Sequence, residues 1–439
     1  MKSTLSISQI ILFLFLTLYP ILPDYCRFAS VPSYSLLVIL LSGLWVLFDG
    51  TRFKLAREFF GVFILYFSIE ILCMVLHSEV ITLFRFVVEQ MLVLFILTNT
   101  LRKFDFNYCL RLIVVTSGIV AFSGVLEYIF EFNIWSLIEN YSYSTASLGS
   151  IEYFRLGSIR IEQSFNHAIS YAAYIMLSVF LCIYVIKTNS KFIYKAILCV
   201  LLLNLLLTKT RSVLLITAFG ILLIYLINKE HKVRTRKQVL LGGVIVSGAI
   251  LAFIIALICS KGIRSSFQQY FYMLAGLFSS DYRSMVGGID NPFTYRFSLF
   301  TEIWNNLKHN RVFGIGVNAT DNMKIAFFNT QYNVTLYNNS IDNTYLRELS
   351  KYGVFGLSSY ILMYGYFLVS GGKHMKAKKN DLFYKYFFII VLTYMIVLFT
   401  FPQMQEYRLF FVIISMFIVY RDEHDETNTQ VNKVGALQA

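Results

Sequence analysis

The stretch HAISYAAYIMLSVFLCIYVI, residues 167–186, decides the fold class. It has no acidic or basic side chain apart from its opening histidine, and as a helix it is long enough to cross the roughly 30 Å hydrocarbon core of a bilayer. The chain is 57% hydrophobic and 14% charged, with a mean hydropathy of +0.63, which is too apolar for a soluble domain of this length. The sequence therefore predicts an all-α integral membrane protein.

Comparable apolar runs recur along the whole chain. About twelve of them reach roughly the length of a transmembrane helix. They lie at 8–22, 33–48, 59–77, 82–99, 108–130, 167–186, 193–208, 212–228, 239–259, 354–370, 384–400 and 408–420. We expect a polytopic protein with one transmembrane domain over residues 1–425, followed by a cytoplasmic, disordered polar tail at 426–439.

The distribution of Lys and Arg predicts the orientation. If the N-terminus is cytoplasmic, every loop on that side carries positive charge, as the positive-inside rule requires. These residues are Lys2, Arg52, Lys54, Arg57, Arg102, Lys103, Lys187, Lys191, Lys195, Lys229, Lys232, Arg234, Arg236, Lys237, Lys373, Lys376, Lys378, Lys379 and Arg421. Both termini are then cytoplasmic, and the net charge of +13 reflects topology and attraction to anionic membrane lipids, not nucleic-acid binding.

Two long loops remain on the outer side, at 131–166 and 260–353, and we expect them to form the active site. Within the second loop, Phe300, Ile303, Trp304 and Leu307 fall at helical spacing, which predicts an amphipathic helix on the membrane surface. The Phe267–Phe278 stretch is a candidate for another. Asp342 is placed at the N-cap of a helix that leads into the tenth span.

Five arginines lie on the outer side although positive-inside pressure acts against them there. Guanidinium groups at a membrane surface suit a diphosphate, because their planar fork makes bidentate, charge-assisted hydrogen bonds. Interfacial snorkelling is the alternative interpretation for each of them. They are Arg155, Arg160, Arg211, Arg296 and Arg408.

At this point the motifs resemble a known family. Arg296, Trp304 and Phe313-Gly314-Ile315-Gly316, followed by Asn343, nine residues, Gly353 and Gly356, are similar to the O-antigen polymerase and ligase superfamily of bacterial surface-polysaccharide assembly. Thr210-Arg211-Ser212 resembles its Ser-Arg element, and the stretch from Arg155 to His167 resembles the segment that opens its central spans. The resemblance covers roughly residues 150 to 400 and implies a GT-C-like membrane glycosyltransferase.

The resemblance also implies the reaction. A growing glycan on undecaprenyl diphosphate would be transferred to a new lipid-linked repeat unit of O-antigen, capsule or exopolysaccharide, at the outer face of the bacterial plasma (inner) membrane. Ligases of this superfamily carry His at the position of Asp342, so this chain favours a polymerase over a ligase that hands finished polymer to a lipid A core. The expected partners are the undecaprenyl-diphosphate-linked oligosaccharide and membrane lipids, and the pathway allows for a chain-length regulator protein.

The chemistry of the transfer assigns roles to these residues. Asp342 is the candidate base for the attacking hydroxyl, and Asn343 orients the acceptor or caps the helix. Arg211 and Arg296, with Arg155 or Arg160, would stabilise the diphosphate leaving group. A single displacement predicts inversion at the anomeric carbon.

Further candidates come from the outer loops. Asp24 is a rival base by analogy with other lipid-dependent glycosyltransferases, and His167 is a candidate substrate contact. Tyr345 is a candidate sugar-stacking ring. The outer loops contain no clustered carboxylates and the cysteines no CxxC spacing, so we expect no cofactor, no metal and no disulfide.

Charges also lie inside the predicted spans. Arg85 and Glu89 are four residues apart on one helical face, and Glu70 reaches a similar depth, which predicts an internal ion pair or triad. Such groups also mark ion paths. A polysaccharide flippase or other transporter therefore stays open as an alternative.

Overall fold

Apolar helices make up most of the chain that the computed structural model describes. The described residues are 6–23, 26–28, 31–49, 53–137, 154–155, 158–165, 167–228, 292–329, 334–338 and 341–438. The predicted span at 239–259 and the predicted Phe267–Phe278 helix lie outside them.

Every other predicted apolar segment coincides with a helix. In chain order the helices are α1 (Ile7–Thr17), α2 (Ser33–Asp49), η1 (Arg57–Phe60), α3 (Val62–Leu76), α4 (Val80–Phe86), the π-helical turn η2 (Val87–Leu92), α5 (Val93–Leu101), α6 (Phe106–Phe130), η3 (Ile134–Leu137), α7 (Ala168–Thr188), α8 (Phe192–Leu207), α9 (Arg211–Ile227), α13 (Pro292–Asn306), α14 (Val317–Asp321), α15 (Thr344–Ala377), α16 (Leu382–Val397) and α17 (Tyr407–Gln438).

Four of these helical stretches are both long and apolar enough to cross a membrane. They are Val80–Leu101, Phe106–Phe130, Ala168–Thr188 and Thr344–Ala377, and several shorter apolar helices accompany them. The chain is a mostly helical, multi-pass membrane protein. The number of spans stays a prediction.

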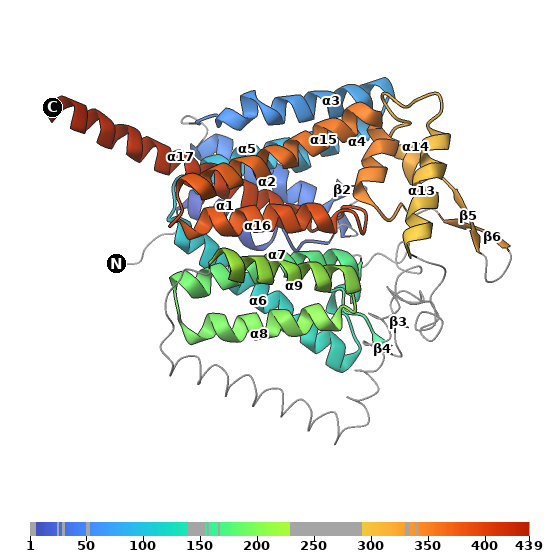
Figure 1. The fold of residues 1–439 in the computed structure, drawn as a ribbon, viewed down its shortest axis with the longest axis horizontal. Helices are drawn as coiled ribbons and strands as arrows, with labels where there is room; N and C mark the ends of the chain where they lie inside the picture. Colours follow the sequence, from blue (N-terminus) through green and yellow to red (C-terminus); the bar gives the residue numbers. More distant parts are fainter. Residues whose placement is uncertain are drawn as a thin grey trace, which may run out of the picture.

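The helices lie side by side in one bundle (Figure 1). Helix α7 occupies the interior of the bundle, and 83% of the residues in its most apolar stretch are buried. It packs against α6, α8, α9 and α16. Helix α15 packs against α3 and α16, and α17 packs against α5. A helix that is apolar on all sides fits such an interior position, which explains why the sequence around Ala168–Thr188 carries no polar face.

The bundle has two different ends. One end, the loop end, carries α13, α14 and the strand pairs, and α17 projects beyond the opposite end, the termini end (Figure 1). Helix α17 runs from Tyr407 to Gln438. The disordered tail at 426–439 stays a prediction.

Three short antiparallel strand pairs depart from the all-α prediction. They are β1 (Arg27–Phe28) with β2 (Val31–Pro32), β3 (Phe154–Arg155) with β4 (Ser158–Ile159), and β5 (Ile325–Asn329) with β6 (Val334–Asn338). The longest pair, β5 and β6, is rich in aromatic and β-branched residues, which favour strands over helices. These strands were not predicted from the sequence.

The predicted amphipathic helix is confirmed as α13, with a shifted buried face. Leu299, Ile303 and Leu307 are buried against Ile341 and Leu349. Phe300, which the prediction placed on the same face, is 43% exposed and stacks on Trp304 at 6.2 Å between ring centroids.

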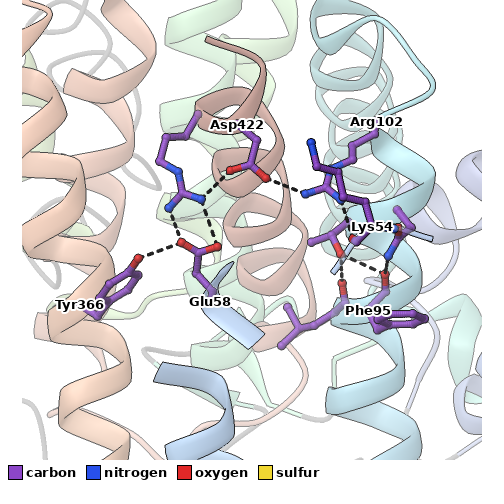
Figure 2. A network of polar contacts seen from close by, with 10 residues as sticks. Lys54, Glu58, Phe95, Arg102, Tyr366 and Asp422 are labelled. Carbon is purple, nitrogen blue, oxygen red and sulfur yellow. Dashed lines mark hydrogen bonds and ion pairs between the residues drawn. The ribbon is translucent and has the colours of Figure 1, made fainter. Parts of the chain in front are cut away.

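A polar network joins four segments at the termini end (Figure 2). Arg421 on α17 forms an ion pair with Glu58 of η1, and its Nη2 also lies 2.6 Å from Asp422 Oδ1. Arg102 donates to Asp422 at 2.6 Å, and the Tyr366 hydroxyl on α15 donates to Glu58 at 2.8 Å. Because Glu58 and Arg421 are almost fully buried, each charge depends on its partners for the solvation that it has lost.

Glu58→Ala should therefore destabilise the bundle strongly. Breaking a buried ion pair from one side costs about 3–5 kcal/mol, and we expect a clear fall in the thermal unfolding midpoint of the purified protein. The control is Arg111→Ala, which removes an exposed pair with Asp105 at 3.7 Å and should cost less than about 1 kcal/mol. Equal midpoints for the two variants would refute this account of the network.

Candidate functional site

A break in α15 organises the loop end of the bundle. At Gly353 the backbone has φ 69° and ψ −162°, which interrupts the helix. The groups that lose their helical partners pair with the loop before α14. Ile315 and Gly316 donate their N–H groups to the carbonyls of Ser350 and Lys351, and Val354 and Phe355 donate theirs to those of Arg311 and Val312, at 2.8–3.3 Å. The two glycine motifs of the sequence thus meet backbone to backbone.

This close approach explains why both positions are glycine. A Cβ at Gly314 would stand 2.4 Å from the carbonyl oxygen of Lys351, and one at Gly353 would stand 2.3 Å from that of Val312. Both residues also have positive φ, at 72° and 69°, which is costly for a residue with a side chain.

The turn between α3 and α4 holds the other side of this loop. Glu79 accepts a hydrogen bond from the N–H of Asn318 at 2.7 Å, at the start of α14. His77 Nε2 lies 3.3 Å from the carbonyl oxygen of Phe313, and the Thr320 hydroxyl lies 3.0 Å from that of Ser350. The loop from Arg311 to Asp321 is therefore fixed between α3 and α15.

The N-terminus of α15 corrects one prediction. Asn343, and not Asp342, is the N-cap, because its Oδ1 accepts the N–H of Leu346 at 3.1 Å. Asp342 precedes the cap and is half-buried. Thr344 fastens this end to the segment after α16, with its N–H donating to Leu398 O at 2.9 Å and its hydroxyl to Phe401 O at 2.8 Å.

Tyr345 is placed differently from its predicted role in sugar stacking. It is only 7% exposed, its ring packs on Tyr360 and Phe399, and its hydroxyl donates to Met395 O at 2.9 Å. Its aromatic faces are thus already used in packing.

Two of the predicted arginines come together at a second position on the loop end. Arg160 follows β4 and is 6% exposed. Its Nε donates to Thr208 O at 3.2 Å and its Nη2 to Thr210 Oγ1 at 3.4 Å, in the turn between α8 and α9. Arg211 is the first residue of α9 and directly follows that turn. Arg160 therefore shapes the turn that presents Arg211.

His167 and Glu406 lie at the same end. His167 is the N-cap of α7 and accepts the N–H of Ile169 at 3.0 Å through Nδ1, so one ring nitrogen has a structural role. One turn later, Ser170 donates to Glu406 at 2.5 Å. Burial raises the pKa of the Glu406 carboxyl, which lies in the segment between α16 and α17, to about 7.

For the remaining predicted site residues, the structure gives the secondary-structure element for some and leaves Asp24 outside the described residues. Arg155 is in β3 and Arg296 is in α13, so both belong to the loop end. Arg408, which was predicted to lie on the outer side of the membrane, is fully buried within the protein. It donates to Leu22 O at 2.6 Å and lies 3.5 Å from the centre of the Tyr34 ring, so it ties α17 to the first two helices.

A polar cavity of about 150 Å³, which the sequence did not predict, lies beside the break in α15. Glu70 and Tyr66 of α3, Gln90 of η2 and Gln403 contribute to its wall. So do four residues of the first turns of α15, and the full set is Tyr66, Glu70, Phe86, Gln90, Arg347, Glu348, Lys351, Tyr352, Gln403 and Tyr407.

The predicted buried charges divide between this cavity and a separate pair. The Arg85 and Glu89 pair is confirmed at 3.2 Å, and Tyr34 and Ser35 complete it by donating to Glu89. Glu70 is not its third member, because it faces Glu348 and Lys351 across the cavity. The sequence signal that could have indicated the cavity was the pair Glu348 and Lys351, which are three residues apart in the helix that follows Asn343.

The fold and these sites define a multi-pass helical membrane protein whose polar machinery gathers at one end of the bundle. A family model described as O-antigen ligase matches residues 196–361, from α8 to the first turns beyond Gly353. That part of the chain, less than half of the whole, is consistent with the O-antigen polymerase and ligase superfamily, which confirms the resemblance seen in the sequence. No curated protein is found to match the chain.

The docking of the glycine loop predicts a large difference between two glycines of one helix. Gly353→Ala should cost at least about 1–3 kcal/mol in backbone strain alone, so the thermal midpoint should fall. Gly365→Ala is the matched control in α15, since nothing lies within 4 Å of its added Cβ, and it should be neutral or stabilising. Similar midpoints for both variants would show that the break is not a constraint.

Proposed function

We propose that the protein polymerises lipid-linked oligosaccharide repeat units of O-antigen, capsule or exopolysaccharide. The observation that carries the proposal is the family match over residues 196–361, because this one stretch contains Arg211, Arg296 and Asp342. The described backbone supports it further, since α9, α13 and α15 each begin or lie at the loop end of the bundle (Figure 1).

The reaction is an inverting glycosyl transfer from undecaprenyl diphosphate. A hydroxyl of the acceptor sugar attacks the anomeric carbon of the donor, the bond from that carbon to the diphosphate oxygen breaks, and the hydroxyl proton passes to a base. We assign the base to Asp342, whose carboxyl is half-buried beside the cap of α15. Arg211 and Arg296 would stabilise the charge that develops on the departing diphosphate.

The positions of the other predicted residues suit supporting roles. Arg160 is largely occupied by the turn before Arg211, so it positions that turn. Asn343 caps the helix behind Asp342. Arg155 in β3 is the second candidate contact for the diphosphate.

The proposed location is the bacterial plasma (inner) membrane, with the loop end facing the periplasm or exterior. The cations predicted to be cytoplasmic support this orientation, since Lys54, Arg102 and Arg421 gather in one network at the termini end (Figure 2). A lipid carrier in the outer leaflet would then reach the loop end directly.

An O-antigen ligase is the second candidate function, because that is the activity in the description of the matching family. The polymerase is favoured because Asp342 stands where ligases of the superfamily carry His. The alternative of a flippase or other transporter is supported by the Arg85 and Glu89 pair inside the bundle. Its partners Tyr34 and Ser35 give that pair a structural explanation.

The proposal predicts that Arg211→Ala, Arg296→Ala and Asp342→Ala each reduce chain elongation by about 10²-fold or more while the protein still inserts. The measurement is the length distribution of polymer made by membranes carrying each variant. Arg111→Ala, at the termini end, is the control and should give polymer of normal length.

The products that accumulate separate the alternatives. Single unpolymerised units on the lipid carrier indicate a polymerase, and long polymer still on its carrier indicates a ligase. Movement of the lipid-linked unit across vesicles without a new glycosidic bond would establish a transporter. Normal polymer from all three variants would rule out the assigned residues.

A further inference from the structure

The cavity between Glu70 of α3 and Glu348 of α15 holds charged groups that the proposed reaction does not use. Side-chain exposure falls from 26% at Arg347 and 15% at Lys351 to 9% at Glu348. Glu70, also in the wall, is fully buried. The polar surface therefore continues from the loop end into the bundle.

Two of these groups already have partners. Arg347 forms an ion pair with Asp321 at 2.8 Å, which holds its guanidinium at the mouth of the cavity. Lys351 Nζ lies 3.4 Å from Glu348 Oε1. The contact of Lys351 with Glu348 thus engages one oxygen of that carboxyl group.

Glu70 is the unusual member. Neither of its carboxyl oxygens makes a hydrogen bond of normal geometry in the described part of the chain, although the Tyr352 side chain interacts with this carboxyl group. A buried carboxyl group without such bonds is expensive, so proteins keep one mainly where a ligand or a proton satisfies it. Its position in the wall of a cavity makes a ligand the direct explanation.

The backbone next to Glu70 supports this interpretation. Gln90 belongs to the π-helical turn η2, and such turns occur frequently at functional sites because they change the direction of side chains. Gln90 Oε1 accepts a hydrogen bond from the Tyr66 hydroxyl at 3.4 Å. Opposite, the Gln403 side chain is held by the hydroxyls of Tyr360 and Tyr364.

The chemistry of the wall selects the class of ligand. Two carboxylates oppose a phosphate, and the cations of Lys351 and Arg347 oppose a metal ion. Sugar hydroxyl groups fit this wall better, because carboxylates accept hydrogen bonds from hydroxyls and amides both accept from them and donate to them. The rings of Tyr66, Tyr352 and Tyr407 offer apolar faces. About 150 Å³ is below the roughly 300 Å³ of the smallest drug-sized pockets and suits a single sugar ring.

We infer that this cavity is a sugar-binding subsite for the acceptor, with Glu70 and Glu348 accepting hydrogen bonds from ring hydroxyls. The inference rests on the proposed glycosyl transfer, in which a lipid-linked sugar must be held next to Asp342. Helix α15 connects the two sites, since Asp342 precedes its N-cap and Glu348 lies in its second turn.

The test measures binding separately from transfer. The probe is the repeat-unit oligosaccharide that mild acid releases from the lipid carrier of the producing strain, titrated onto the full-length protein in nanodiscs. Glu70→Gln and Glu348→Gln should each weaken binding at least tenfold, because an amide keeps the volume but replaces one acceptor oxygen with an NH2 group that only donates. Glu302→Gln on α13 is the matched control outside the cavity and should bind as the unmodified protein does.

The thermal midpoint of each variant is measured in parallel. A binding loss without a fall in the midpoint supports the subsite. Undiminished binding by both cavity variants, or no binding by the unmodified protein, overturns it. A chain that binds the oligosaccharide but never forms a glycosidic bond would refute the proposed polymerase and leave the sugar site standing, so the two failures are distinguishable.

Discussion

The structure of the loop end depends on one backbone contact, between the loop of Gly314 and the break in α15 at Gly353. A helix broken within a membrane protein exposes N–H and carbonyl groups that no lipid can satisfy. Here the four groups at the break, from Ser350 to Phe355, pair with backbone from Arg311 to Gly316. The break is therefore stable only while the loop stays docked, and the loop approaches closely only because both contact positions lack a Cβ.

Several buried charges of the bundle have close partners among the described residues. Glu58 with Arg421 and Arg408 with the carbonyl of Leu22 join segments far apart in the sequence. Glu89 pairs with Arg85 one turn before it and also accepts hydrogen bonds from Tyr34 and Ser35 of α2. These contacts fasten helices to one another where the hydrophobic effect contributes little to their association. Glu70 departs from the pattern, and it does so in the wall of a cavity.

Hydropathy predicted the described helices well, because a long apolar run has few alternatives in a bilayer. The motif residues Gly314, Gly316, Asn343 and Gly353 also lie within residues 196–361, the region that the family model matches. Their spacing carried no information on what they contact, so the backbone hydrogen bond from Gly316 to Lys351 could not be predicted. The burial of Arg408 and the cavity around Glu70 were missed for the same reason, since each depends on residues brought together from distant segments. The β5 and β6 hairpin is local, and its strand-forming residues were not recognised in the sequence.

The spacing between Asn343 and Gly353 acquires a physical meaning from these contacts. Asn343 caps the helix, Gly353 breaks it, and the nine residues between them form a rod of roughly 14 Å at 1.5 Å per residue. Both ends of this rod are fixed, by Thr344 on Leu398 and by the glycine loop at Lys351. Within it, Arg347, Glu348, Lys351 and Tyr352 all line the cavity, and they form pairs three or four residues apart, which are neighbours on a helix surface. Inserting or deleting one residue between Asn343 and Gly353 would rotate these side chains away from the cavity. The motif therefore sets the direction of the charged side chains as well as the position of the helix break.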